Sequence, residues 1–374
     1  MPSTEFERIT VHRLQVPLTV PYRLAFGPVE FYDTIIAEIT ARDGRSGLGE
    51  ATVLTGYTEE TIEDSWRVAR EVASEIARLG RGAVRSRLDA LAKSHPFTAT
   101  AFGTALEMLE ASPFLEVRDR TPVALVGMLN ATGERARREE FERLLAAGYR
   151  TVKLKVGFDV ERDLEHVRAV QALARGKAAI RIDANQGYSS GQGVAFVRAL
   201  DPAGIELFEQ PCPAGDWDAH LTVARAAAVP LMLDESIYGL ADIERAAERK
   251  AATYVKVKLM KLGTMHALAG AIERIRSLGM RPVLGNGVAC DLGCWMEGCV
   301  AARHIDNAGE MNGFLKARRA LLTEPLEFHD GAMWLKPGFA PRLDPERLEA
   351  FLVDSVTCPA RTVVGAAGAS GGSP

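Results

Sequence analysis

Charged residues recur at the ends of consecutive β-rich runs in the second half of the chain. From Lys155 to Lys258, the step from one charged end to the next is 28, 26, 25 and then 24 residues. Each step is close to the length of one strand plus one helix, so each segment is expected one parallel strand further around a sheet. The five segments are Lys153-Leu154-Lys155, Asp183-Ala184-Asn185, Glu209-Gln210-Pro211, Asp234-Glu235-Ser236 and Lys256-Val257-Lys258.

Three of these strand ends carry a carboxylate: Asp183, Glu209 and Asp234. On adjacent strands they form a cluster of like charge, which is strongly unfavourable unless a cation lies among them. No histidine or cysteine occupies a matching strand end, and ligation by oxygen alone favours Mg²⁺ over zinc. The spacing therefore predicts a Mg²⁺ site, with Mn²⁺ as the alternative ion. The competing interpretation, separate helix caps and surface salt bridges, leaves the regular spacing unexplained.

The first and last segments each carry lysines on one face, because residues i and i+2 of a strand point the same way. Strands two and six of an eight-stranded ring are four apart, so Lys155 and Lys258 are expected to face each other across the mouth. Loss of a proton next to a carboxylate makes an ene-diolate, whose charge needs fixed cations; the metal and Lys153 are the predicted ones. A lysine base must be neutral, and we expect nearby positive charge and burial to lower the pKa of Lys258.

Upstream of these segments the pattern predicts a separate α+β unit. The region from Glu5 to Val53 alternates as strands do, with a turn at Asp43-Gly44, which indicates an antiparallel meander. Helical stretches follow at Glu59–Leu79, Val84–Lys93 and Thr98–Glu110, with Thr58 as the expected N-cap of the first.

Beyond Arg120 the rhythm changes to short β-rich runs that alternate with amphipathic stretches. This alternation predicts a parallel barrel with outer helices, of TIM-barrel size. A doubly wound open sheet is the alternative, but no Gly-x-Gly-x-x-Gly turn follows an early strand. The eight expected strands are Pro122–Leu129, Thr151–Val156, Ala179–Asp183, Gly204–Glu209, Pro230–Asp234, Tyr254–Met260, Arg281–Leu284 and Asn307–Met311.

The series Lys-x-Lys, Asp-x-Asn, Glu-Gln-Pro, Asp-Glu-Ser and Lys-Leu-Met-Lys resembles the enolase superfamily, specifically its muconate lactonizing enzyme subgroup. The resemblance spans nearly the whole chain and implies a modified TIM barrel, (β/α)7β, with an α+β capping domain. It implies that Asp183, Glu209 and Asp234 bind Mg²⁺. It also implies that Lys155 and Lys258 are the acid/base pair and that Lys153 helps to neutralise the substrate carboxylate.

Four regions follow from the pattern and the resemblance. Residues 1–120 are expected to form the first part of the capping domain, and residues 121–325 the barrel, with its active site at the carboxyl ends of the strands. Residues 326–364 contain a predicted hairpin around Asp330-Gly331 and a short helix at Asp344–Leu352, and are expected to return to the cap. Residues 365–374 consist of Gly, Ala, Ser and Pro and are expected to be a disordered tail.

Further residues are expected to bind substrate or support the site. Asn185 and Glu235 stand beside the carboxylates, and Asn286 lies between two glycines after strand seven. Tyr57 falls in a segment where the family has a specificity loop.

The last strand ends at Glu310, where dipeptide epimerases of the subgroup carry Asp-x-Asp; here the second position is Asn312. Glu310 resembles the muconate cycloisomerase arrangement instead. Lys256 replaces an asparagine found in much of the family. The pattern assigns no role to Lys256 or to Lys261.

These observations predict a racemase or epimerase of an amino-acid derivative. A cycloisomerase of the muconate type, or a syn-dehydratase of the o-succinylbenzoate synthase type, would use the same ene-diolate. A catalytically silent binding protein is the alternative from another class.

The 45 basic and 49 acidic residues give a net charge of −4, which argues against nucleic acid as a partner. Met1–Thr10 has no basic region and no apolar stretch, so we expect no export signal. No apolar run is long enough for a membrane span, and five scattered cysteines indicate reduced thiols in a cytoplasm. The expected partners are a small carboxylate substrate and, because the family often oligomerises, further copies of the chain.

Overall fold

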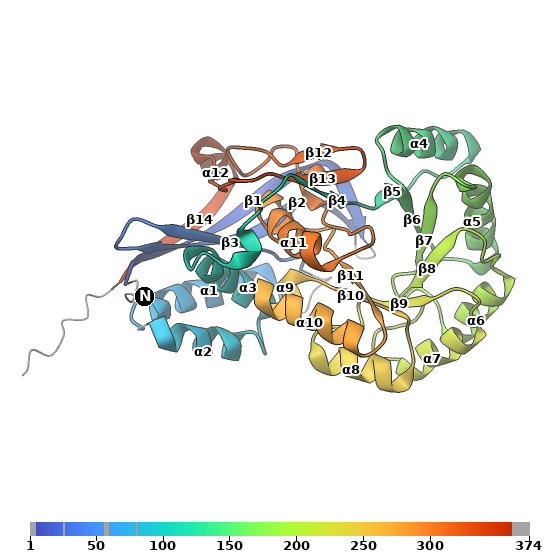
Figure 1. The fold of residues 1–374 in the computed structure, drawn as a ribbon, viewed down its shortest axis with the longest axis horizontal. Helices are drawn as coiled ribbons and strands as arrows, with labels where there is room; N and C mark the ends of the chain where they lie inside the picture. Colours follow the sequence, from blue (N-terminus) through green and yellow to red (C-terminus); the bar gives the residue numbers. More distant parts are fainter. Residues whose placement is uncertain (1–4, 25–26, 56–59, 80, 361–374) are drawn as a thin grey trace, which may run out of the picture.

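The computed structural model describes residues 5–24, 27–55, 60–79 and 81–360. Two parts are visible in Figure 1: an antiparallel sheet with helices α1, α2 and α3, and a curved parallel sheet with helices around its outside. The barrel class with a capping domain, predicted from the sequence, is confirmed.

The capping sheet has the order β14-β1-β2-β3, with every pair antiparallel. The predicted meander is confirmed, with Gly44 in the left-handed region (φ 84°) at the turn between the second and third strands. The fourth strand comes from the far end of the chain and pairs with the first along most of its length. The strands are β1 (Phe6–Leu24), β2 (Gly27–Ala41), β3 (Ser46–Thr52) and β14 (Leu352–Pro359).

Helices α1 (Ile62–Ile76), α2 (Arg81–Leu91) and α3 (Pro96–Leu109) accompany this sheet. Helix α3 lies so close to β3 that a Cβ added to Gly47 or Gly49 would collide with carbonyl oxygens of α3. This close approach explains why glycine occupies both positions of the strand.

The predicted start of the first helix at Glu59 was wrong: α1 begins at Ile62, and Thr61 caps it by accepting a hydrogen bond from the Asp64 amide. The physical reason is Glu60, which is buried outside the helix. Its carboxylate accepts hydrogen bonds from the Phe97 amide (2.7 Å) and the Thr98 hydroxyl (2.8 Å) at the start of α3. The proposed cap Thr58 lies outside the described residues.

The barrel sheet contains seven parallel strands in chain order. Its strands are β5 (Gly127–Leu129), β6 (Thr151–Lys155), β7 (Ala179–Asp183), β8 (Ile205–Glu209), β9 (Leu231–Leu233), β10 (Tyr254–Val257) and β11 (Arg281–Leu284). The connecting helices are α4 (Glu134–Ala146), α5 (Val160–Ala174), α6 (Ser190–Ala199), α7 (Trp217–Ala226), α8 (Leu240–Arg249), α9 (Leu259–Leu262), α10 (Met265–Ser277) and α11 (Asp291–His304).

The predicted eighth strand, Asn307–Met311, is not a strand in the structure but a single bridge. The Gly309 amide donates to the Ala124 carbonyl and the Glu310 amide to the Leu284 carbonyl, at 2.9 and 3.0 Å. Just before β5, the Val126 amide donates to the Gly309 carbonyl (2.9 Å). Together these bonds join the segment to both open edges of the seven-stranded sheet, so they close the ring with one or two residues instead of a full strand.

Two further strand predictions differ from the structure. The expected strand Pro122–Leu129 is divided into β4 (Thr121–Ala124) and β5, because β4 pairs with a later hairpin outside the barrel sheet. The expected strand Tyr254–Met260 ends at Val257, and the short helix α9 begins two residues later.

The predicted hairpin around Asp330-Gly331 is present as β12 (Glu327–His329) and β13 (Ala332–Leu335). It does not join the cap: β13 pairs with β4, and the Gly331 amide donates to the Ala147 carbonyl (2.7 Å) before β6. The hairpin therefore covers the amino-terminal end of the barrel. The chain returns to the capping sheet only with α12 (Pro345–Phe351) and β14. Two short 3₁₀ turns lie at Pro113–Leu115 and Gly313–Leu315.

The cap and the barrel share one apolar core. Cap residues such as Tyr32 and Ile36 belong to the same buried cluster as Trp295 and Met296 of α11. Cys294 and Cys299 of this helix, and Cys290 just before it, are buried there as free thiols. No helix in the described ranges has the length and hydrophobicity needed to cross a membrane.

Candidate active site

The strand-end residues predicted from the spacing lie in the predicted order around one end of the barrel. Lys155, Asp183 and Glu209 are the last residues of β6, β7 and β8. Asp234 directly follows β9, and Lys258 directly follows β10. Because β6 and β10 are four places apart in the sheet, the three carboxylates stand between the two lysines.

Two further lysines reach the carboxylates from one layer deeper in the barrel. The Lys153 ammonium lies 2.9 Å from Asp183 Oδ2, 2.6 Å from Glu209 Oε2 and 2.7 Å from Glu310 Oε1. The Lys256 ammonium lies 3.0 Å from Glu209 Oε1, 3.3 Å from Asp234 Oδ2 and 2.6 Å from Glu310 Oε2. Both lysine side chains are only 2% exposed. Lys256, to which the sequence assigned no role, is therefore part of the buried cluster.

Each outer lysine pairs with a carboxylate of the cluster. Lys155 Nζ donates to Asp183 Oδ2 at 2.6 Å and also to the side-chain oxygen of Asn185, while Lys258 Nζ lies 2.7 Å from Asp234 Oδ1. Lys155 is 31% exposed and Lys258 8%. Each lysine therefore sits at the boundary between the carboxylate cluster and the open mouth.

Asn185 and Glu235 support the mouth. The Asn185 amide group donates to Glu235 Oε1 at 2.9 Å, and its backbone amide donates to Asp183 Oδ1 at 2.8 Å. Asn185 has φ of 40°, a left-handed conformation in which Asn is favoured among non-glycine residues, so the turn after β7 points its side chain back over the site.

Ion pairs with lysines keep most carboxylates of the cluster in their charged form. Burial disfavours the charged form of Asp183, but Lys153 and Lys155 outweigh it and lower its pKa to about 2. The pKa values of Asp234 and Glu310 are also held well below the ordinary range by their lysine neighbours, despite burial. Glu209 differs: burial and the neighbouring Asp183 raise its pKa to about 7.

The expectation that the pKa of Lys258 is lowered was wrong for the protein without a bound metal ion. Burial is the largest single influence and opposes the charged form, but the charge and hydrogen bond of Asp234 together with the charge of Glu235 outweigh it, and the pKa of Lys258 is raised. The neighbour Lys261 behaves as the expectation describes: burial and the nearby Lys258 lower its pKa to about 8. Lys261 donates to the Ile237 carbonyl (2.8 Å) and lies over the ring of Tyr238.

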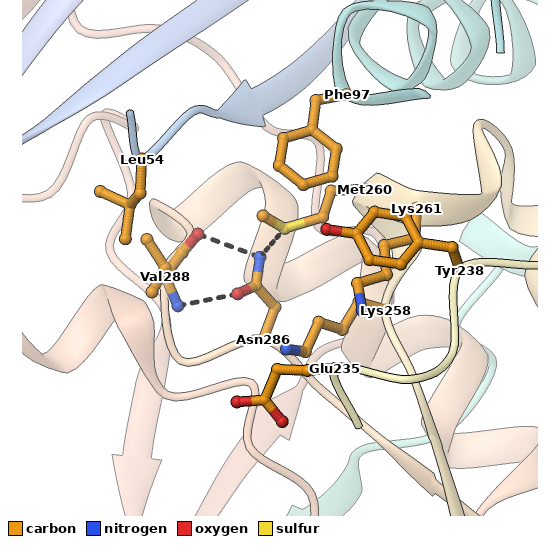
Figure 2. Close-up of a pocket in the computed structure, with 9 residues that line it drawn as sticks. All are labelled: Leu54, Phe97, Glu235, Tyr238, Lys258, Met260, Lys261, Asn286 and Val288. Atoms are coloured by element: carbon orange, nitrogen blue, oxygen red, sulfur yellow. Dashed lines mark hydrogen bonds between the residues drawn. The ribbon is translucent and has the colours of Figure 1, made fainter. Parts of the chain in front are cut away.

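A pocket opens beside Lys258 (Figure 2). The cap contributes Leu54 and Phe97 as an apolar wall, and the barrel contributes the polar side. Asn286 lines the pocket, but its amide oxygen and nitrogen bond the backbone of Val288 at 3.1 and 3.0 Å. Asn286 thus shapes the loop after β11, while the charged groups nearest the cavity are those of the barrel. The barrel residues are Glu235, Tyr238, Lys258, Met260, Lys261, Asn286 and Val288. Tyr57 lies outside the described residues.

The sequence did not reveal several residues that hold the site in shape. Gln210 accepts hydrogen bonds from the amides of Asp234 (2.9 Å) and Ser236 (3.3 Å), and its nitrogen lies 3.1 Å from Nε2 of the buried His220. Glu297 of α11 accepts from the amide of the residue after Lys258 (2.9 Å). The sequence did contain a signal for Glu297, because a single glutamate in an otherwise apolar helix indicates a buried polar contact. No comparable signal marks His220.

The three strand-end carboxylates have the chemistry and the burial that a divalent cation site requires. Asp183, Glu209 and Asp234 are each at most 3% exposed, and carboxylate oxygens are the ligands that Mg²⁺ prefers. Within the described ranges, no three Asp, Glu, His or Cys side chains converge closely enough to hold an ion in this arrangement. Lysine ammonium groups lie against their oxygens instead.

The fold and the site define a class: a parallel-barrel enzyme with lysines and carboxylates at the carboxyl ends of its strands. Residues 136–347, more than half of the chain, match the enolase C-terminal domain-like family. The chain therefore belongs to that family and is an enzyme of the enolase superfamily, in agreement with the resemblance seen in the sequence.

Relatives and solved structures agree with this placement. The chain is 33% identical to an L-Lys-D/L-Arg epimerase of Methylococcus capsulatus, over 68% of this chain and 75% of the relative. It is 26% identical to muconate cycloisomerase 1 of Pseudomonas putida, over 92% of this chain and 97% of the relative. A dipeptide epimerase from Cytophaga hutchinsonii, solved with Mg and D-Ala-L-Val, has a TM-score of 0.84 at 20% identity, covering 94% and 99% of the two chains.

Proposed function

We propose that this enzyme removes the α-proton of a carboxylate substrate and returns it on the opposite face, as a racemase or epimerase of an amino-acid derivative. The observation that carries the proposal is the placement of Lys155 and Lys258 on strands four apart, with Asp183, Glu209 and Asp234 on the strands between them. Two bases on opposite sides of one carbon are what inversion by proton transfer requires.

Asp183, Glu209 and Asp234 would hold Mg²⁺, or Mn²⁺ in its place. When bound, the ion would supply a Lewis acid for the substrate carboxylate. The chain's own contribution is a second, fixed cation: Lys153 is buried among the carboxylates and is placed to meet the charge that develops on the ene-diolate.

Lys258 is the base whose environment supports a proton-transfer role most directly. Its partner Asp234 raises its pKa, so weakening that contact would bring Lys258 toward the neutral form. The apolar cap residues Leu54 and Phe97 cover the pocket beside it and would exclude water from the reacting carbon.

The environment of Glu310 favours a substrate without a free α-ammonium group. Both of its oxygens are in ion pairs, with Lys153 at 2.7 Å and Lys256 at 2.6 Å, and Asn312 follows where a second carboxylate would be needed. Several ammonium groups already face this mouth, and a further cation would be repelled. We therefore infer an N-acylated amino acid in preference to a dipeptide with a free amino terminus.

A cycloisomerase of the muconate type is the second candidate. It is favoured by the glutamate at Glu310 and by the long match to muconate cycloisomerase 1 of Pseudomonas putida. It would use the ene-diolate with one lysine as acid and base, as would a syn-dehydratase of the o-succinylbenzoate synthase type. An epimerase inverts a centre, whereas these reactions change connectivity or release water.

The test is solvent exchange in D₂O with Mg²⁺ against a pooled library of N-acyl amino acids, dipeptides, muconates and acid sugars, followed by mass spectrometry. We expect deuterium to enter the α-position of an N-acyl amino acid. Lys155→Ala and Lys258→Ala should each impair that exchange, and Lys177→Ala, a change at an exposed lysine, should leave it unchanged. Absence of α-exchange together with a cyclised or dehydrated product would favour the second candidate; absence of any reaction would contradict both.

We also propose that the enzyme works in the cytoplasm, on the support of five unpaired cysteines, four of them buried. Assembly with further copies of the chain stays a prediction from the family resemblance, as does the substrate-loop role of Tyr57.

A further inference from the structure

Lys256 occupies the position from which a lysine can compete with a metal ion. Its ammonium lies against two of the three proposed ligands, Glu209 at 3.0 Å and Asp234 at 3.3 Å. The side chain is 2% exposed, so it has no route to solvent within this cluster. A divalent ion bound by these carboxylates would have to take over oxygens that Lys256 now contacts.

Glu310 provides the alternative partner. Its Oε2 atom lies 2.6 Å from the Lys256 ammonium, the shortest of that lysine's contacts, and Glu310 is not one of the three proposed ligands. Lys256 can therefore release Glu209 and Asp234 and still remain paired inside the barrel. Without Glu310, a buried ammonium would be left next to an arriving cation, which is strongly unfavourable at this depth.

The charges of the inner cluster support this division. The four carboxylates Asp183, Glu209, Asp234 and Glu310 carry four negative charges when ionised, and Lys153 and Lys256 carry two positive ones. The two remaining negative charges are met from the mouth by Lys155, which pairs with Asp183, and by Lys258, which pairs with Asp234. The pair formed by Lys256 and Glu310 is thus neutral as a unit, and it can be present without preventing metal binding.

We propose that Lys256 is a built-in counter-cation of this metal site, which competes with the divalent ion for Glu209 and Asp234 and withdraws onto Glu310 when the ion binds. This inference rests on the proposed metal site. It assigns Lys256 a positioning role and predicts that the metal affinity of the enzyme is set by the Lys256–Glu310 pair.

The experiment measures Mn²⁺ affinity by electron paramagnetic resonance of the free ion, at one fixed pH, on chelator-treated full-length protein. Lys256→Met removes the competing charge, and we expect Mn²⁺ to bind at least about tenfold more tightly than to the unmodified protein. Glu310→Gln keeps the shape but removes the alternative partner, and should weaken binding by at least about tenfold. Lys177→Met, at an exposed site on the outside of the barrel, is the matched control and should not change the affinity.

The double variant Lys256→Met, Glu310→Gln separates this mechanism from two unrelated defects. If the two residues act as a pair, Glu310→Gln has little left to disturb once Lys256 is gone, so the double variant should bind within about threefold of Lys256→Met; two independent defects would instead return the affinity to that of the unmodified protein. Circular dichroism and thermal unfolding of each variant confirm that it is folded, and a variant that fails this check is replaced by Lys256→Asn or Glu310→Asn.

Equal affinity in Lys256→Met and the unmodified protein would overturn the counter-cation role while leaving the proposed metal site intact. Failure of both proteins to bind Mn²⁺ would overturn the counter-cation role and the metal site together. A third outcome separates the two proposals. If the Mn²⁺ affinities change as expected and Asp183→Asn abolishes binding, but the unmodified enzyme exchanges no substrate proton, the proposed reaction has failed and the role of Lys256 stands.

Discussion

Two regions of the molecule bury carboxylates, and they neutralise them differently. At the barrel mouth, Asp183 and Asp234 are met by lysine ammonium groups. At the junction between cap and barrel, Glu50 of β3 accepts hydrogen bonds from the backbone amides of Cys290 (2.6 Å) and Gly293 (2.7 Å), at the start of α11. Glu107 of α3 does the same for the first amide groups of α10.

Apart from Glu209 of the mouth, whose pKa is raised to about 7, the pKa values of the carboxylates separate the two regions. Lysines lower the pKa of Asp183 to about 2 and hold that of Asp234 well below its usual range, whereas burial raises the pKa of Glu50 to about 7 and that of Glu107 above its ordinary value. A helix start offers partial positive charge, which compensates a buried carboxylate less fully than an ammonium does. The mouth therefore keeps charged groups ready for chemistry, and the junction uses carboxylates to fasten the cap to the barrel.

The largest effect on stability is expected at the mouth. Lys153→Met removes the ammonium shared by Asp183, Glu209 and Glu310 and leaves buried carboxylates without it. We expect the free energy of unfolding to fall by about 3–5 kcal/mol, measured by urea denaturation in the presence of EDTA. A change of less than about 1 kcal/mol would mean that the cluster is not held by charge.

At the junction, Glu50→Ala leaves two buried amides at the start of α11 without their acceptor. The expected loss in unfolding free energy is about 2–3 kcal/mol, smaller than at the mouth because the bonds are to neutral amides. Urea denaturation followed by tryptophan fluorescence measures it, with Glu142→Ala at an exposed site as the control. Equal losses for Glu50→Ala and Glu142→Ala would contradict the fastening role.

The pH dependence of stability should distinguish the regions further. Because the pKa of Glu50 is raised to about 7 in the folded state, its contribution is complete below the unfolded value near 4.5 and is lost as the pH rises through 7. Relative to Glu50→Gln, the unmodified protein should lose about 1–3 kcal/mol between pH 4.5 and 7.5. Denaturation at several pH values tests this, and a difference that grows in the opposite direction would show that Glu50 is charged throughout.

The smallest effect is expected where an ion pair is exposed. Arg135 and Glu139 are one turn apart on α4, 2.8 Å from each other, and 91% and 51% exposed. Arg135→Ala should change the unfolding free energy by less than about 0.5 kcal/mol. A loss comparable to that of Lys153→Met would remove the distinction between buried and exposed pairs on which the comparison depends.

The sequence predicts the mouth better than the junction for a physical reason. The charged ends of β6 to β10 recur once per strand and helix, so their order around the barrel follows from the chain itself. Glu50 and Cys290 are 240 residues apart, and no local pattern relates them. The partners of Lys256 were missed in the same way, because Glu310 arrives from a segment that forms a bridge and not the expected strand.

The central claim is that two lysines act on opposite faces of one carbon. The most direct measurement follows α-deuterium exchange of each enantiomer of the exchanging substrate separately, by proton NMR in D₂O, with the unmodified enzyme, Lys155→Ala and Lys258→Ala. The account predicts that the unmodified enzyme exchanges both enantiomers and that each variant retains exchange of only one, a different one in each case. If either variant still exchanges both enantiomers, or if both variants retain the same one, the two-lysine account is contradicted.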